Sequence, residues 1–176
     1  MKTRILLRIG VSVAGFSALA AAALPRASGT VQAGENDIGG VVSGPKGPEA
    51  GVWVIAETNG LPTKFVRIVV TDDQGRYRFL TIRPGAYPWP NHRNAWRPNH
   101  IHFSYFGPAF ATRLITQMYF PDDPLLAYDP IYNSVPTAAR KRLQASFDMA
   151  TTRPEWALAY KFDVVLRGRN ATPMEN

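Results

Sequence analysis

The hydrophobic positions of residues 38–79 occur in short runs that are separated by turn residues. Some runs are apolar and rich in β-branched side chains, and others alternate apolar with polar positions, which is the pattern of buried and half-buried strands. Glycine, proline and aspartate lie between the runs, and turn signals at this spacing are typical of a β-sandwich. The expected strands are 39–42, 52–57, 65–71 and 76–79, with a tight turn at 72–75.

The second half continues the strand pattern with one interruption. Residues 136–148 begin with a proline and place Ala138, Ala139, Leu143 and Phe147 at helical spacing, so they predict a short helix. The polar tail after Gly168 is expected to fray or to pack on a partner. Further strands are expected around 100–102, at 114–120 and at 156–166, which makes the predicted fold an all-β sandwich with one short helix.

Length and composition agree with this fold class. A chain of 176 residues suits one domain, and 15 prolines and 14 glycines favour strands and turns over long helices. The net charge is +7, but Lys2, Arg4, Arg8 and Arg26 lie within residues 1–33, which leaves +3 on the rest. That excess suits the attraction of an anionic small molecule and is weak support for nucleic-acid binding.

Residues 1–33 resemble a secretory signal. Three basic residues precede an apolar, alanine-rich run at 9–24, and the small residues at 31–33 offer a cleavage site, with 20–23 as an alternative. An uncleaved membrane anchor is the competing interpretation, although the run is short for a bilayer span. We expect an exported protein, periplasmic or secreted and free of the membrane after cleavage, whose residues 34–176 form one domain.

A candidate metal site lies at His100 and His102. The side chains of alternate residues in a strand point to the same face, so the two imidazoles project together while Ile101 points away. Tyr87 follows a Pro-Gly turn that would return its phenol over that face, and a phenolate suits ferric iron better than zinc. The chain has no cysteine, which excludes disulfides and thiolate sites. A pair of histidines with only a structural role is the alternative.

Several stretches carry a resemblance to known families. The segments PGAYPW, RPNHIHF, TRLITQMYF and LAYKFDVVLRG resemble the C-terminal half of intradiol ring-cleavage dioxygenases, most closely the β subunits of members that act on protocatechuate. The upstream segment GPKGPEAGVWVIAET is similar to carboxypeptidase-regulatory-like domains. Both families contain the TDDQGRY turn and a related sandwich. The resemblance therefore implies one continuous transthyretin-like or immunoglobulin-like domain, with regulatory-like strands at 34–79 and the metal-site half at 80–176.

The resemblance implies a non-haem Fe(III) site. In the family two tyrosines and two histidines hold the iron, and Tyr87, His100 and His102 match three of these positions. The other tyrosine should lie upstream, but this chain has no tyrosine before Tyr77, which matches a strand position instead. The fourth ligand is left open between a water, His92, Glu57 and a group from a partner chain.

The implied reaction is intradiol cleavage of a catechol such as protocatechuate by O2, giving a cis,cis-muconate-type product. Tyr87 would accept a proton from the substrate, Arg97 would stabilise developing negative charge and Gln117 would line the oxygen pocket. A structural ion pair of Arg97 and a buried amide at Gln117 are the alternatives. Trp89 would wall the cavity, and Pro90 stands where the β subunits usually have arginine.

Partners and competing functions follow from the same resemblance. A homologous subunit is expected to complete the assembly. The competing function is a non-catalytic exported β-sandwich binding module with a degenerate metal site, and a third possibility is a composite sequence that does not fold stably. We assign three aspartates to turns, Asp122, Asp123 and Asp129. We assign four aromatic residues to packing in the core and at an interface, Tyr105, Phe106, Tyr119 and Phe120.

Overall fold

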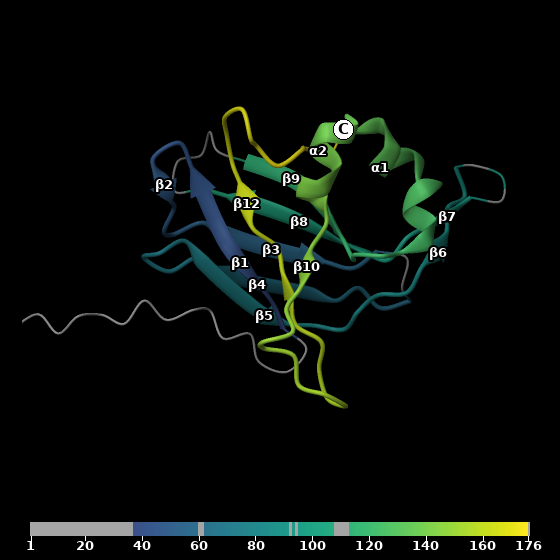
Figure 1. The fold of residues 1–176 in the computed structure, drawn as a ribbon, viewed down its shortest axis with the longest axis horizontal. Helices are drawn as coiled ribbons and strands as arrows, with labels where there is room; N and C mark the ends of the chain where they lie inside the picture. Colours follow the sequence, from purple (N-terminus) through teal and green to yellow (C-terminus); the bar gives the residue numbers. More distant parts are fainter. Residues whose placement is uncertain (1–36, 60–61, 92, 94, 108–112, 176) are drawn as a thin grey trace, which may run out of the picture.

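The computed structural model describes residues 37–59, 62–91, 93, 95–107 and 113–175 as two β-sheets that pack face to face, with short helices at one end (Figure 1). The all-β fold class predicted from the sequence is confirmed. The expected signal segment 1–33 and His92 lie outside the described residues. Within the described part, no helix is long and apolar enough to cross a membrane.

The first sheet is organised around β1 (Asp37–Gly44). This strand pairs antiparallel with β2 (Gly47–Pro48) and β5 (Arg76–Leu80). It pairs in parallel with β11 (Tyr160–Lys161) and β12 (Val164–Val165), and β10 (Ser146–Phe147) joins β11. The first described strand and the last ones are therefore neighbours, which ties the two halves of the chain into one sheet.

The second sheet carries the candidate site. Its antiparallel order is β4 (Val66–Val70), β3 (Trp53–Glu57), β8 (His100–Phe106) and β9 (Arg113–Tyr119). Alternate residues of β8 point into the sandwich, where Ile101, Phe103 and Tyr105 are buried among core residues of both sheets. The intervening residues of β8 lie on the outer face, so the core fixes the orientation of both histidines.

A short hairpin and several helical turns cover one end of the second sheet (Figure 1). The hairpin is β6 (Tyr87–Pro88) with β7 (Trp96–Arg97). The helical segments are η1 (Pro124–Ala127), α1 (Pro130–Ser134), α2 (Thr137–Arg140) and η2 (Lys141–Leu143).

The helix expected at 136–148 is shorter in the structure. It ends after α2 and η2, because the backbone of Ala145 donates to the Tyr119 carbonyl at 2.9 Å and draws the chain into an extended conformation along β9. Ser146 and Phe147, assigned to the helix from the sequence, form β10 instead. The helical spacing of the apolar residues was therefore overridden by tertiary pairing.

The strand expected at 156–166 is divided into β11 and β12. Between them the Asp163 carboxylate accepts from the Val41 backbone at 3.0 Å, and the Phe162 backbone donates to the Gly39 carbonyl at 2.8 Å. The Phe162 carbonyl then lies directly against Gly40. The break in the strand thus depends on a close approach that a residue with a side chain would prevent.

We expect Gly40→Ala to lower the free energy of unfolding by about 2–3 kcal/mol, because the added Cβ would lie 2.6 Å from the Phe162 carbonyl carbon. Urea unfolding followed by tryptophan fluorescence measures the change. Gly85→Ala is the control, since a Cβ there meets nothing within 4 Å. Equal unfolding midpoints for the two variants would show that the approach at Gly40 is not constrained.

The C-terminal tail packs on the sandwich, so the expectation that it frays is wrong. Thr172 is buried and its hydroxyl accepts from the Val165 backbone at 3.0 Å. The Thr116 hydroxyl donates to the Pro173 carbonyl at 2.7 Å, and the Glu175 backbone donates to the Ile115 carbonyl at 2.8 Å. The tail therefore runs along the free edge of β9 and ends beside the helical segments.

Candidate functional site

The histidine pair lies on the outer face of the second sheet, as the alternation predicted. His100 is paired with Tyr119 across β8 and β9, and His102 with Gln117, while Ile101 is buried in the core. The Nε2 atoms of the two imidazoles are 3.2 Å apart. The Nε2 atoms of the two rings therefore face each other.

Tyr87 adds an oxygen next to the His100 nitrogen. The β6–β7 hairpin places it opposite Arg97, and its phenol oxygen lies 3.4 Å from Nε2 of His100. Two ligands about 2.1 Å from one metal and about 100° apart are separated by roughly 3.2 Å. The structure thus brings together the three residues that the sequence assigned to the metal, and the separations of His100 from Tyr87 and from His102 are close to those of ligands on one ion.

The hydrogen bonds of the imidazoles fix which nitrogens are free. Nδ1 of His100 lies 2.6 Å from the Pro98 carbonyl, and Nδ1 of His102 lies 3.3 Å from Oε2 of Glu175. A carbonyl and a carboxylate only accept, so both Nδ1 atoms carry a proton, and in a neutral ring this arrangement leaves the lone pair on Nε2. Burial, together with the charge of Arg97, lowers the pKa of His100 to about 3, so this ring is neutral.

The donor set fits ferric iron. With both rings neutral, the two Nε2 lone pairs would face each other at 3.2 Å, an arrangement that a cation between them stabilises. Two imidazoles with a phenol form a nitrogen and oxygen set that iron accepts. Burial raises the pKa of Tyr87, although the Arg97 charge acts in the opposite direction, so the phenol keeps its proton until the charge of a bound cation displaces it.

A fourth protein ligand is not assembled in the described part of the chain. Glu57 lies opposite His102 across β3 and β8, but its carboxylate pairs with Lys64 at 2.8 Å. No group of three His, Cys, Asp or Glu residues that could hold a metal occurs among the residues described. Among the residues described, the candidate ligands are therefore two histidines and one tyrosine.

A buried polar network supports the site. Arg97 and Asp129 are 3% and 0% exposed, and Nη2 of Arg97 donates to Oδ2 of Asp129 at 2.9 Å. The same nitrogen donates to Oε1 of Gln117 at 2.6 Å and to the Tyr119 hydroxyl at 3.0 Å. Burial is the largest single effect and disfavours the charged form of Arg97, but the hydrogen bond that Arg97 donates to Asp129 and the nearby negative charge together raise its pKa, so the guanidinium stays charged.

Three members of this network were not assigned to the site from the sequence. Asp129 was read as a turn former, and it does cap α1, where its Oδ1 accepts from the Ile131 backbone at 3.0 Å. Tyr119 was assigned to packing, yet its hydroxyl donates to Gln117 at 2.7 Å, and burial followed by the charge of Asp129 raises its pKa. Glu175 lies in the tail; the hydrogen bond with His102, against the effect of burial, lowers its pKa.

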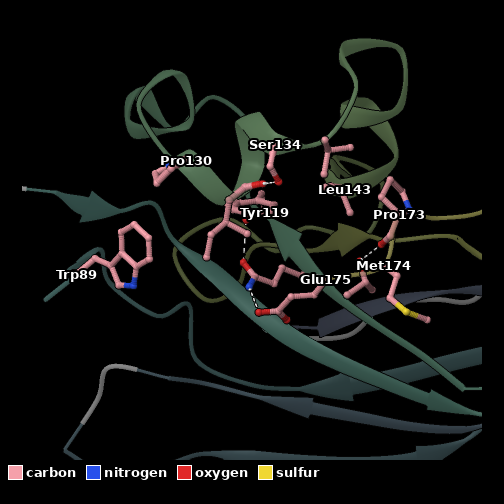
Figure 2. A pocket seen from close by; sticks show the side chains of 12 residues that line it. Trp89, Tyr119, Pro130, Ser134, Leu143, Pro173, Met174 and Glu175 are labelled. Atoms are coloured by element: carbon pink, nitrogen blue, oxygen red, sulfur yellow. Dashed lines mark hydrogen bonds between the residues drawn. The ribbon is translucent and has the colours of Figure 1, made fainter. Parts of the chain in front are cut away.

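A cavity of about 260 Å³ adjoins the network (Figure 2). Trp89 lies at one end of the cavity, and Pro173 and Met174 lie at the other. Glu175 lies below it, and its carboxylate accepts a hydrogen bond from Gln117. Cavities of about 150 Å³ accept benzene, so this one has room for a substituted ring. Glu175 is charged, and no lysine or arginine occurs among the described lining residues. These are Trp89, Thr116, Gln117, Tyr119, Pro130, Ile131, Ser134, Val135, Leu143, Pro173, Met174 and Glu175.

Comparison with known proteins gives consistent results. A family model described as dioxygenase matches residues 34–168. The protocatechuate 3,4-dioxygenase beta chain of Burkholderia cepacia is 69% identical over 106 residues, which cover 60% of this chain and 45% of that protein. The chain therefore spans about half the length of that relative.

Solved structures agree with the fold. The dioxygenase domain of a dioxygenase carbohydrate-binding protein fusion from Streptomyces sp. SirexAA-E is 26% identical, with a TM-score of 0.59 over 78% of this chain and 83% of the other. The hydroxyquinol 1,2-dioxygenase of Pseudomonas putida DLL-E4 is 22% identical, with a TM-score of 0.61 over 76% and 56%. At 22% identity the second likeness shows the fold alone.

Proposed function

Because the chain belongs to the intradiol ring-cleaving dioxygenase family, we propose that it cleaves a catechol between its two hydroxylated carbons with O2 at a ferric site. The product would be a diacid of the cis,cis-muconate type. The observation that supports the proposal most is that Nε2 of His100 lies 3.4 Å from the Tyr87 oxygen and 3.2 Å from Nε2 of His102. These residues would hold the metal.

Bound ferric iron would supply a Lewis acid for the substrate oxygens and the redox chemistry for reaction with O2. The roles of the protein follow from its contacts. The oxygen of Tyr87 lies 3.4 Å from Nε2 of His100, so as a phenolate it would be placed to accept a proton from a substrate hydroxyl. The indole of Trp89, at the end of the cavity, would stack on the aromatic ring.

Arg97 and Gln117 would act on charge and orientation. Arg97 lies opposite Tyr87 in the hairpin and keeps its positive charge, so it would favour negative charge on the bound substrate. The Gln117 amide accepts from Arg97 and Tyr119 and donates to Glu175, so its orientation is fixed. A fixed amide beside the metal ligands would line the space for O2.

Two substrates are candidates. Protocatechuate is the first, because the relative that is 69% identical is a protocatechuate 3,4-dioxygenase beta chain. Catechol without a ring carboxylate is the second, because Glu175 lines the cavity while no lysine or arginine occurs among the lining residues described. A ring carboxylate would meet like charge there without a partner.

The assembly and the compartment are also proposed. The matched relative is named a beta chain, and we propose that this chain likewise associates with a homologous subunit. We further propose that the protein is exported after removal of residues 1–33. Size-exclusion chromatography of the secreted fraction, with mass spectrometry of its N-terminus, tests both statements.

The function is tested on the purified chain by iron analysis and visible spectroscopy. We expect about one iron per chain and a broad visible band that shifts when protocatechuate or catechol is added, with O2 uptake and diacid formation. A protein that stays colourless after ferric loading, and whose stability is indifferent to added iron, would contradict the proposal. It would support the alternative of an exported β-sandwich binding module with a degenerate metal site.

A further inference from the structure

We propose that Glu175, in the C-terminal tail, is a positioning residue that holds the His102 ring with Nε2 facing His100 and Tyr87. The inference rests on the proposed ferric site. It assigns to the tail a part in metal binding, although the tail lies 73 positions beyond His102 in the chain.

The two histidines are held in different ways. Nδ1 of His100 donates to the carbonyl of Pro98, two positions away, so the local backbone orients that ring. The backbone around His102 does not do this. Within the described chain, the partner of its Nδ1 is Oε2 of Glu175 at 3.3 Å. Without that carboxylate the His102 ring would be free to rotate or to carry its proton on Nε2, the nitrogen that faces the site.

Glu175 is itself fixed in place. Its backbone donates to Ile115 at 2.8 Å, and its Oε1 accepts from Nε2 of Gln117 at 2.6 Å. Two positions earlier, the carbonyl of Pro173 accepts a hydrogen bond from the Thr116 hydroxyl. Each carboxylate oxygen therefore has its own partner, and the side chain joins His102 to the buried network of Gln117 and Arg97. This is the arrangement in which a carboxylate orients a metal-binding imidazole.

The hydrogen bond between Glu175 and His102 should raise the affinity of the site for a metal ion. A carboxylate that accepts from Nδ1 keeps the proton off Nε2 and makes that nitrogen a better donor, and loss of such a partner commonly lowers metal affinity 10–100-fold. Glu175→Ala is expected to weaken ferric binding by this factor. Glu175→Gln is expected to recover only part of the affinity, because its amide oxygen can still accept from Nδ1 of His102 but its amide nitrogen would then face the donor Nε2 of Gln117.

The first experiment needs no metal. Imidazole ¹⁵N spectra of the metal-free full chain near pH 8 report which ring nitrogen carries the proton, and the chain has three histidines, so the signals can be assigned by substitution. We expect the Nδ1–H form for His102 in the wild type and in Glu175→Gln, and a shift toward Nε2–H in Glu175→Ala. An unchanged His102 signal in Glu175→Ala would overturn the proposal.

The second experiment measures ferric affinity by competition with nitrilotriacetate. Arg142→Met is the control, because it removes another tether of the tail, the 3.0 Å bond from Arg142 to the Ala171 carbonyl, without touching the site. Only Glu175→Ala should lose 10–100-fold affinity. Equal losses in the two variants would show that tail packing alone matters and would overturn the proposal. If the wild type binds no iron while the ¹⁵N shift is seen, the ferric function fails and the role of Glu175 in holding His102 stands.

Discussion

Asp129→Ala is expected to lower the free energy of unfolding by about 3–5 kcal/mol, which is the usual cost of breaking a buried ion pair from one side. Arg97 is 3% exposed and would keep its charge without the carboxylate that now lies 2.9 Å from Nη2. With so little of its surface exposed, the guanidinium has little bulk water available to replace the lost partner. Chemical unfolding of the metal-free chain measures the change.

The control for this prediction is Asp123→Ala. Asp123 caps η1 as Asp129 caps α1, and its carboxylate accepts from the Leu125 and Asn99 backbones at 2.9 Å. It contacts no buried cation in the described structure, so its loss should cost about 1 kcal/mol, the value of a cap. Combining Asp129→Ala with Arg97→Met should restore most of the stability. Equal costs for the two aspartates would show that Asp129 acts as a cap only.

The ion pair also affects the geometry of the candidate site. Arg97 joins Asp129 to Gln117 and Tyr119 through one nitrogen, and Gln117 in turn holds Glu175. A change at Asp129 therefore releases side chains on β9 and in the tail together. Substitutions in this network are expected to couple and not to add, because the members share partners.

The sequence was sufficient to predict the parts of the site that depend on local geometry. Strand alternation placed His100 and His102 on one face, and the turn before Tyr87 returned its phenol to them. These relations involve neighbours in one strand or one hairpin. The fold class was predictable for a similar reason, since the strands with strong apolar patterns, β3, β5, β8 and β9, lie close to their expected positions.

Relations between distant segments were not predictable in this way. Glu175 reaches His102 because the tail pairs with the edge of β9, and an unpaired strand edge leaves no signal in the sequence of its partner. Asp129 was assigned to a turn because an Asp-Pro pair is a local turn signal. One of its carboxylate oxygens does cap α1, and the other accepts from Arg97, which the local sequence does not show. The helix predicted at 136–148 was too long, because helical spacing does not show where the backbone leaves the helix to pair with a strand.

Tyr87→Phe is expected to remove the visible band of the ferric protein, because a phenolate bound to Fe(III) produces that colour and Tyr87 is the tyrosine whose oxygen lies within 3.4 Å of a site nitrogen. The two histidines would remain, so some iron binding should persist with weaker affinity. Turnover of a catechol should fall by about 10²–10⁴-fold, since the group that accepts the substrate proton is lost. Visible spectra, iron analysis and O2 uptake measure the three effects.

Tyr128→Phe is the matched control, because its side chain is 80% exposed and the same hydroxyl is removed outside the site. It should keep the band and the activity. If Tyr87→Phe retains the wild-type colour, the phenolate comes from another tyrosine. Tyr119 is then the next group to test, although its hydroxyl is already held by Arg97 and Gln117 and burial raises its pKa. Loss of colour in Tyr87→Phe with the histidines intact would instead show that Tyr87 supplies the phenolate, in a chain that has no tyrosine upstream of Tyr77.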